Sequence, residues 1–248
     1  MLIEKTGYGK SLCYQFPATQ FSGTTIVFSP LIALMRDQVI KLQEKGIAAE
    51  YINYQQTQEE QEEIFEKLVT GKVKILYISP ERIDNDMWRE NFKKINISFI
   101  VVDEAHCISV RGHDFRPHYR RIVEIVKLLP DNTPVLAVTA TATKDVEEDI
   151  KKQLGEDKVT SVRGSLMRKN LKLSVQRCNS FEEKFLWLGN NVNNFKGNGI
   201  IYTGTVKDTM IYSKWLNYIG IPSVYYNGRM KGEEKQIIEK GLMNNEWK

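Results

Sequence analysis

The chain has 248 residues, of which 42% are hydrophobic and 27% are charged, and its formal net charge is +4. This composition predicts a globular protein with one large domain or two modest ones. No apolar run approaches the ~18 residues that a membrane span requires, and the N-terminus shows no secretory signal, so we expect an intracellular protein without a membrane partner.

Three cysteines, Cys13, Cys107 and Cys178, lie too far apart in the sequence to form a C-x-x-C pair. We therefore expect no zinc in this chain, no disulfide framework, and reduced thiols that are mostly buried. The charge is uneven, because residues 166–248 contain 13 Lys and Arg against 7 Asp and Glu, whereas residues 1–165 contain 22 against 24. A basic second part suits a polyanionic partner, although such an excess is also common on an ordinary solvated face.

Apolar runs of strand length alternate with helical periods, which predicts parallel strands covered by helices. In chain order, we expect strands at 24–29, 74–79, 97–103 and 134–140, a helix that contains Ile32, Met35, Val39 and Leu42, and helices at about 116–128 and 143–154. Thr57 with Glu60 matches a capping box at the start of an acidic helix.

The apolar pattern lapses around residues 155–172 and then restarts, which places a domain boundary near residue 165. Beyond it we expect strands at 171–177, 199–202 and 223–226, with helices at 181–192, 206–219 and 231–243. The sequence therefore predicts an α/β protein with two similar lobes, residues 1–165 and 166–248, the second of which is incomplete.

A phosphate-binding turn is indicated by Thr6-Gly7-Tyr8-Gly9-Lys10-Ser11, which follows a short apolar run. A Gly-x-Gly turn that opens a helix points backbone N–H groups at phosphate oxygens; Lys10 adds a charge for the outer phosphates, and the Ser11 hydroxyl can bind Mg²⁺. The full P-loop pattern places a glycine six positions before the lysine, and Glu4 stands there, so the pattern is met only in part.

The second motif, Asp103-Glu104-Ala105-His106, follows a buried apolar run and completes the indication of ATP and Mg²⁺. Asp103 can hold Mg²⁺ through water, Glu104 can orient or deprotonate the attacking water, and His106 can report the state of the γ-phosphate to neighbouring loops. The alternative is an ordinary solvated turn between a strand and a helix.

The third motif, Thr139-Ala140-Thr141, also follows a strand, and its hydroxyls can bond carboxylates or backbone groups across a cleft. Alone it would only cap the following helix, a role that Thr143 can take instead. Beside the first two motifs, it indicates coupling between nucleotide and the rest of the protein.

These strings, together with Cys107-Ile108-Ser109 and Gly112-His113-Asp114-Phe115-Arg116-Pro117, resemble the RecQ family of superfamily 2 DNA helicases. The stretches at 6–15, 29–39 and 79–82 also look like RecQ motifs in the right order, and 199–202 and 226–228 are weaker matches. The resemblance implies two RecA-like lobes that bind ATP and Mg²⁺ between them. It further implies 3′ to 5′ movement on single-stranded DNA and unwinding of forked duplexes in recombination and repair, in a bacterial cytoplasm or a nucleus.

In such families the DNA strand crosses loops that follow the strands of both lobes. The residues that the resemblance assigns to DNA binding are Pro30, Leu31, Ser79, Pro80, Arg82, Arg111, Phe115, Arg116, Thr203 and Gly204. Taken singly, the loops at 30–31, 79–82 and 203–205 are each more typical of an ordinary loop than of a DNA contact.

The resemblance assigns the coupling of DNA contact to ATP hydrolysis to the loop that contains His113, Asp114, Phe115 and Arg116. Phe115 and Arg116 can stack on bases or pair with phosphate, and Asp114 can fix the loop. The alternative is that Phe115 anchors the following helix and Arg116 pairs with a carboxylate. Arg111 stands where the family usually has a tryptophan, which puts the coupling in question because a guanidinium offers less apolar contact area.

The segment that reads adenine and the arginine that reaches the γ-phosphate in this family fall outside residues 1–248, so we expect weak nucleotide binding and little unwinding. Two other hypotheses remain open: a non-catalytic nucleotide-binding or nucleic-acid-binding remnant, and a fragment of a DEAH-type RNA helicase. Protein partners are not indicated by the sequence.

Overall fold

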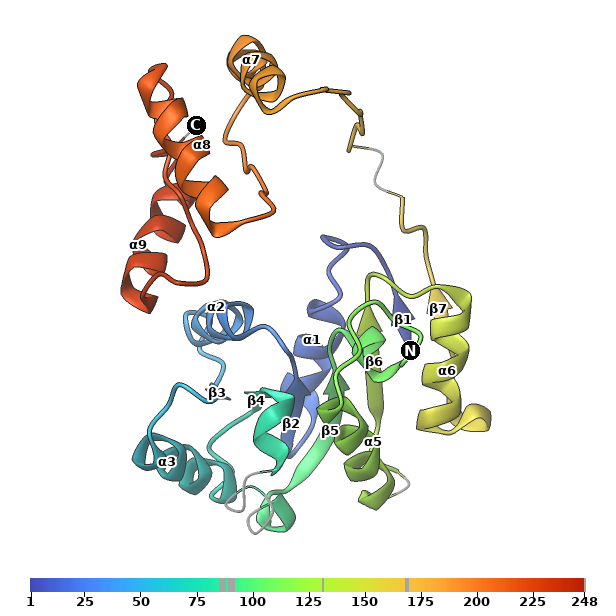
Figure 1. Ribbon diagram of the computed structural model, residues 1–248. Coiled ribbons are helices and arrows are strands. Elements are labelled where there is room, and N and C mark those ends of the chain that lie inside the picture. The colour runs from blue at the N-terminus through green and yellow to red at the C-terminus, as the bar shows by residue number, and fades with distance from the viewer. Residues whose placement is uncertain (85–87, 89–91, 131, 168–169, 248) are drawn as a thin grey trace. The chain divides into compact units, whose positions relative to one another are not determined.

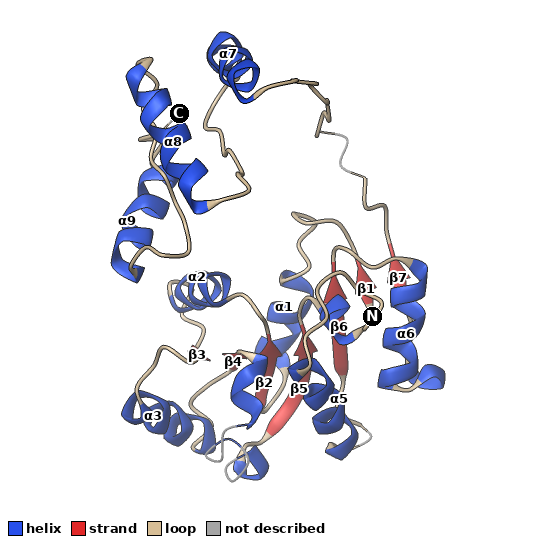
Figure 2. Cartoon of the chain, viewed as in Figure 1, coloured by secondary structure: helices blue, strands red, loops and turns tan. Residues whose placement is uncertain are grey.

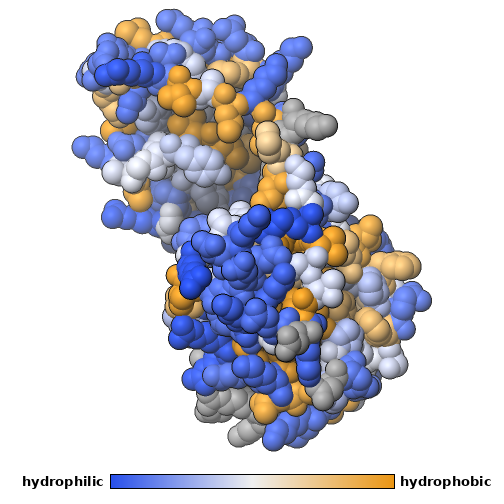
Figure 3. All heavy atoms as spheres, turned by 90° about the vertical axis from the view of Figure 1, so that its right-hand side faces the viewer, coloured by the Kyte–Doolittle hydropathy of each residue, from blue (hydrophilic) through white to orange (hydrophobic). Residues whose placement is uncertain are grey.

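The computed structural model describes residues 1–84, 88, 92–130, 132–167 and 170–247. It divides into two compact units, Met1–Leu171 (unit 1) and Lys172–Lys248 (unit 2) (Figure 1). None of the described helices is long and apolar enough to cross a membrane. The face drawn in Figure 3 mixes hydrophilic and hydrophobic side chains.

Unit 1 is built around one seven-stranded sheet in the order β3-β4-β2-β5-β6-β1-β7, in which every neighbouring pair is parallel. The strands, drawn as red arrows in Figure 2, are β1 (Leu2–Ile3), β2 (Thr24–Phe28), β3 (Ala49–Ile52), β4 (Ile75–Ile78), β5 (Ile97–Val102), β6 (Val135–Thr139) and β7 (Val162–Arg163). The four strands expected from apolar runs are confirmed as β2, β4, β5 and β6. All four residues of β4 and all five of β2 are buried, as parallel strands covered on both faces should be.

Helices cover both faces of this sheet. Alternate residues of each strand point to opposite faces, so each face presents apolar side chains that a helix can cover. On one side, Val27 and Val101 pack against α1 (Leu12–Gln20) and α2 (Ile32–Gln43). On the other side, Phe28 and Val102 pack against α3 (Gln58–Val69), α5 (His118–Leu128) and α6 (Lys144–Leu154). Short 3-10 turns are η1 (Pro80–Asp84), η2 (Phe92–Lys94), η3 (Ala105–Ile108) and η4 (Glu156–Lys158).

Local sequence signals explain where two of these helices begin. The capping box at α3 is confirmed, because the Glu60 N–H donates to Thr57 Oγ1 at 3.3 Å and the Thr57 N–H donates to the Glu60 carboxylate at 2.8 Å. The expected cap of α6 by Thr143 is confirmed as well, since the Val146 N–H donates to its hydroxyl oxygen at 3.3 Å.

Because all seven strands are parallel, the loops that follow them meet at one edge of the sheet, where ligands of open α/β sheets bind. Backbone hydrogen bonds extend this order just past the strands: Glu4 N–H donates to the Thr139 carbonyl at 3.1 Å, and Asp103 N–H donates to the Phe28 carbonyl at 2.9 Å. The first, second and third motifs therefore lie on the neighbouring strands β1, β5 and β6, with β6 between the other two.

Unit 2 contains the three helices that the sequence predicts, α7 (Phe181–Asn191), α8 (Val206–Tyr218) and α9 (Gly232–Met243), and the turn η5 (Val192–Asn194). The three strands expected at 171–177, 199–202 and 223–226 are wrong, since no strand is formed within the described residues 170–247. A parallel strand needs a hydrogen-bonded neighbour and a covered face. Leu173 and Val175 are instead 96% and 98% exposed, so the first of these segments is not covered.

Candidate nucleotide and nucleic-acid site

The first motif forms an open turn between β1 and α1. Gly7 and Gly9 have φ values of 84° and 96°, in the left-handed region that a side chain would strain. The Lys10 ammonium donates to the carbonyls of Glu4 and Lys5 at 2.8 and 3.3 Å. The loop's own carbonyls therefore hold the lysine charge close to the turn, where a phosphate group can take their place.

Glu4, which replaces the first glycine of the general pattern, has a structural role. It is buried and continues the pairing of β1 with β6 through its N–H bond to Thr139. Its carboxylate lies against the backbone of Gly164, where an added Cβ would come within 1.5 Å of Glu4 Oε1. The residue at this position continues the strand pairing directly after β1 and does not form the turn, and its φ is not in the left-handed region, so glycine is not needed there.

Asp103 stands at the end of β5 as a mostly buried carboxylate. Its oxygens accept hydrogen bonds from the Glu104 N–H at 3.0 Å and from the Ser29 hydroxyl at 3.2 Å. Burial, with Glu104 adding repulsion, raises the pKa of Asp103 to about 6, against the lowering effect of these hydrogen bonds and of Lys10. A carboxylate of this kind gains from a nearby divalent cation, which favours its charged form.

His106 connects the second motif to the third. Its Nδ1 lies 3.2 Å from Glu104 Oε2 and 3.0 Å from Thr139 Oγ1, and the ring is buried. Glu104 itself has φ 48° and ψ 46°, a left-handed conformation that is uncommon for a side-chain-bearing residue and that turns the chain sharply after β5. The two strand ends are thus joined through one imidazole.

Within the third motif, only Thr139 reaches the second. Its hydroxyl oxygen also accepts a hydrogen bond from the Thr141 N–H at 3.3 Å, while the Thr141 side chain is exposed and Ala140 is half-buried. The capping role considered for this motif falls to Thr143, as described above for α6.

The loop after the second motif is tied back onto it. The Arg116 N–H donates to the Cys107 carbonyl at 3.1 Å, and the His113 ring stacks on His106 with centroids 5.0 Å apart. Gly112 allows this approach, because a Cβ there would lie 2.8 Å from the His106 carbonyl oxygen. Of the loop residues assigned to coupling, His113 therefore contacts the second motif directly, through His106.

The structure contains the pairing of Arg116 with a carboxylate that was considered as the alternative to a DNA-binding role. Arg116 donates to Asp114 through Nε at 3.3 Å and Nη2 at 3.1 Å, and this hydrogen bonding lowers the pKa of Asp114. The guanidinium carbon of Arg120, in α5, lies 5.2 Å from the centroid of the Phe115 ring, so Phe115 contacts the following helix.

His106, Cys107 and Asp114 place possible metal-ligating atoms within 4.8 Å of one another. Burial raises the pKa of the Cys107 thiol to about 12, so this thiol is not an activated nucleophile.

The three cysteines are free thiols, but they are not mostly buried as expected. Cys107 is buried, Cys178 is half-buried, and Cys13 is exposed on α1.

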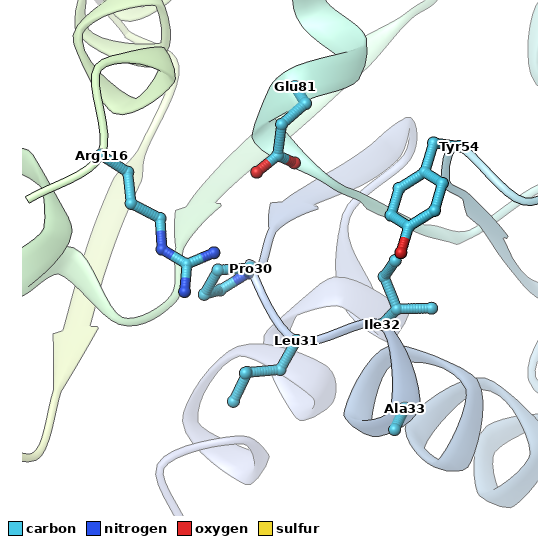
Figure 4. A pocket seen from close by; sticks show the side chains of 7 residues that line it. All are labelled: Pro30, Leu31, Ile32, Ala33, Tyr54, Glu81 and Arg116. Carbon is cyan, nitrogen blue, oxygen red and sulfur yellow. The ribbon is translucent and has the colours of Figure 1, made fainter. Parts of the chain in front are cut away.

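Three of the residues assigned to DNA binding, Pro30, Leu31 and Arg116, line one cavity of about 460 Å³ (Figure 4). The other lining residues, which the sequence reasoning did not select, are Ile32, Ala33, Tyr54 and Glu81. Glu81 belongs to the stretch at 79–82 that resembles a RecQ motif, whereas the sequence gave no signal for Tyr54, because the strand before it, β3, was not predicted.

The remaining DNA-binding candidates lie elsewhere. Ser79 and Pro80 are buried, and the Arg82 guanidinium donates to Gln61 of α3 rather than facing the cavity. Arg111 is exposed, and its backbone N–H donates to Ser109 Oγ at 3.2 Å. Thr203 and Gly204 belong to unit 2, whose placement relative to unit 1 is not determined.

Two further contacts at Asp103 were not expected from the sequence. Ser29, at the end of β2, donates to its side chain, and the Tyr119 hydroxyl donates to its backbone carbonyl at 2.9 Å. The contact with Ser29 could have been suspected from the sequence, because a serine stands directly after a buried strand there. The contact with Tyr119 could not, because it depends on how α5 packs against the sheet.

The chain is similar to known helicases along nearly its whole length. Residues 1–149 match the DEAD/DEAH box helicase family. The ATP-dependent DNA helicase RecQ of Bacillus subtilis is 40% identical over 245 residues, which cover 98% of this chain and 41% of that protein. The RecQ of Haemophilus influenzae is 36% identical over 241 residues, with coverages of 97% and 38%. The chain thus spans about two fifths of the length of these curated relatives.

Solved helicase structures share the fold. The DUF1998 helicase MrfA bound to DNA and AMPPNP has a TM-score of 0.73 at 17% identity, covering 99% of this chain and 38% of that one. A Saccharomyces cerevisiae Dbp5 variant bound to RNA and ADP BeF3 has a TM-score of 0.75 at 18% identity, covering 100% and 63%. Such neighbours are RecA-like helicase domains, which confirms the α/β class. The chain belongs to the DEAD/DEAH box helicase family, and its relatives over nearly its whole length include RecQ helicases.

Proposed function

We propose that this chain is the ATP-hydrolysing part of a RecQ-type DNA helicase, which couples hydrolysis to 3′ to 5′ movement on single-stranded DNA and to unwinding of forked duplexes. The observation that supports it best is the continuous path from Asp103 and Glu104 through His106 to Thr139. The same imidazole stacks on His113 of the following loop. A change at the nucleotide can therefore reach a candidate DNA-binding loop through direct contacts.

In this proposal the first two motifs divide the chemistry between them. Lys10 and the N–H groups of the turn bind the phosphates, and Ser11 and Asp103 offer the hard oxygen ligands that Mg²⁺ prefers, Asp103 through water. Bound Mg²⁺ would neutralise charge on the phosphates during transfer. Glu104 orients the attacking water and accepts its proton, while His106, whose Nδ1 lies 3.2 Å from Glu104 Oε2, fixes the position of the Glu104 carboxylate.

The proposed substrate, DNA, implies work in a bacterial cytoplasm or a nucleus. The chain covers 41% of its Bacillus subtilis relative, so the activity of the whole relative is not assumed for residues 1–248. We expect this part of the protein to bind nucleotide weakly and to unwind little by itself.

Two substitutions separate an enzyme from a binding remnant. Glu104→Gln is expected to keep nucleotide affinity and to lose at least about 100-fold in single-turnover ATP hydrolysis, because the proton acceptor is removed. Lys10→Ala is expected to lose nucleotide binding itself. Exposed residues on the same unit, Glu44→Gln and Lys45→Ala, serve as controls. Equal hydrolysis by wild type and Glu104→Gln would support the remnant.

Binding of one base sequence as DNA and as RNA, measured at stated salt, tests the substrate class. Tighter binding of the DNA strand supports the proposal. Preference for the RNA strand would favour the DEAH-type RNA helicase instead.

A further inference from the structure

The cavity of about 460 Å³ at the edge of the sheet gathers side chains from four separate loops. Pro30 and Leu31 follow β2, Tyr54 follows β3, Glu81 lies in η1 after β4, and Arg116 precedes α5. Figure 4 shows Arg116 and Tyr54 on opposite sides, with the guanidinium and the Glu81 carboxylate both directed toward Pro30. A volume of this size accommodates a small organic group rather than a single ion.

The walls of this cavity suit a flat ligand with polar edges. Leu31 is 46% exposed and Tyr54 is 67% exposed, so an aliphatic side chain and an aromatic ring are both accessible to a ligand. Ile32, Ala33 and Pro30 add apolar surface between them. Aromatic and apolar faces of this kind bind planar rings by stacking, and every nucleobase has such a face.

The charges argue against a phosphate group as the main occupant. The cavity has one carboxylate, Glu81, and one guanidinium, Arg116, which already donates two hydrogen bonds to Asp114. An anion deep in the cavity would meet Glu81 at short range without a positive charge to spare. A neutral ring that offers N–H donors to Glu81 fits better, since carboxylates accept hydrogen bonds from exocyclic amino groups of bases.

Tyr54 is displayed by a rigid turn rather than by a loose loop. The Asn53 side chain accepts from the Gln55 N–H at 2.7 Å, and Gln56 accepts from the Asn53 N–H at 3.0 Å. Gln56 also donates to the Tyr51 carbonyl at 3.0 Å, and Gln61 of α3 donates to the Gln56 carbonyl at 3.0 Å. The turn is therefore held without help from the Tyr54 ring, and a ligand that stacks on the ring need not first order it.

We propose that this cavity is a nucleobase subsite of the DNA path. One base of the strand stacks on Tyr54 and contacts Leu31, and its amino group donates to Glu81. The inference rests on the proposed function, which supplies the strand, and it adds direct contact to a base where the proposed function requires only contact to the backbone.

An abasic oligonucleotide isolates the base contribution, because it retains every phosphate. With a labelled single strand and fluorescence anisotropy, Tyr54→Ala is expected to weaken binding of the base-bearing strand roughly 5- to 100-fold, the range of one lost stacking contact. It should leave binding of the abasic strand and the salt dependence unchanged. Tyr54→Phe keeps the ring and should bind like wild type. Tyr218→Ala, at an 88% exposed tyrosine on α8, is the matched control.

Glu81 is tested by comparing two pyrimidine strands. Cytosine has an exocyclic amino group and thymine does not, so the wild type is expected to bind oligodeoxycytidylate several-fold more tightly than oligothymidylate. Glu81→Ala should bring the ratio of the two dissociation constants close to one, even if it changes both constants. Glu59→Gln, at an exposed position of α3, should keep the wild-type ratio.

The outcomes separate this inference from the proposed function. If wild type binds DNA and nucleotide but Tyr54→Ala binds both strands as wild type does, the nucleobase subsite is wrong and the proposed function stands. If wild type binds nucleotide but no single-stranded DNA, the helicase proposal fails and the subsite with it. Loss of abasic-strand binding in Tyr54→Ala would also overturn the subsite, because the ring would then be acting on the backbone.

Discussion

Asp103 combines two demands that oppose each other. Its proposed role at Mg²⁺ requires a charged carboxylate, whereas burial raises its pKa from the ordinary value of 3.8 to about 6. Since the folded state holds the proton more tightly than the unfolded state, stability falls as pH rises from about 4 to about 6 and stays reduced above that range. At neutral pH the protein therefore holds a buried charge that is unfavourable for folding, as is common at functional sites.

Asp103→Asn is expected to raise the free energy of unfolding by about 1 to 3 kcal/mol near pH 8, because the neutral amide removes the cost of the buried charge. The gain should disappear below about pH 4, where the wild-type carboxyl is protonated in both states. Urea unfolding at the two pH values measures it, and Mg²⁺-dependent hydrolysis should be lost. Asp37→Asn, at an exposed ion pair with Lys41, is the control. A less stable Asp103→Asn protein near pH 8 would contradict this account.

At the scale of elements, the ends of β5 and β6 are joined by the hydrogen bond between His106 and Thr139. Thr139 is fully buried, and its hydroxyl contacts both the imidazole and the Thr141 N–H. The side-chain hydrogen bond between the second and third motifs thus depends on one hydroxyl group.

Thr139→Val keeps the shape of the side chain and removes this hydroxyl. We expect single-turnover ATP hydrolysis to slow roughly tenfold with nucleotide affinity nearly unchanged. The reason is that His106 loses its hydrogen bond to the Thr139 hydroxyl, a contact that orients the imidazole toward Glu104. Histidine ring NMR should show a changed environment for His106 Nδ1. Thr139→Ser restores the hydroxyl and should recover the rate; equal rates in the Ser and Val variants would exclude the hydroxyl as the connection.

Strands could be predicted from the sequence where most of their residues are buried, and helix starts where a cap has a local signal. β2, β4 and β5 each contain a run of at least three apolar residues, and Thr57 and Thr143 are caps with local signals. β3, which was not predicted, has Glu and Tyr at its two half-buried positions, and β7 is a two-residue exposed strand at the sheet edge. The segment at 171–177 was apolar enough to predict a strand, but strand formation depends on a neighbour that local sequence does not specify.

The candidate site divides in the same way. Lys10, Asp103 and His106 belong to short contiguous strings whose chemistry can be recognised before any fold is known. Tyr54 and Glu81 lie near Arg116 only because β3, β4, β2 and β5 are adjacent in the sheet. Sequence spacing gives no indication of that adjacency, so this cavity could be found only from the fold.

At the scale of the whole molecule, stability is unevenly distributed. Both hydrophobic clusters of buried side chains lie within unit 1. Among the described residues of unit 2, the buried hydrophobic side chains are Leu216 and Ile221, at 6% and 8% exposure. The Phe185 ring contacts Tyr212 and Trp215 at 4.7 Å, which joins α7 to α8 with only partly buried aromatic rings.

Regions with little buried apolar area open at lower free-energy cost than a packed core. We therefore expect backbone amides of α7, α8 and α9 to exchange with solvent deuterium at least about 100-fold faster than those of β2, β4 and β5, a difference of roughly 3 kcal/mol in opening free energy. Hydrogen exchange with mass spectrometry on the full chain measures both sets in one sample. Nucleotide added at saturating concentration should slow exchange around β1 and the start of α1 and leave α9 unchanged, since ligand binding stabilises the unit that binds it. Equal protection of α9 and β2 would show that unit 2 is held by contacts as extensive as those of the sheet, and that the low burial of its side chains does not determine its stability.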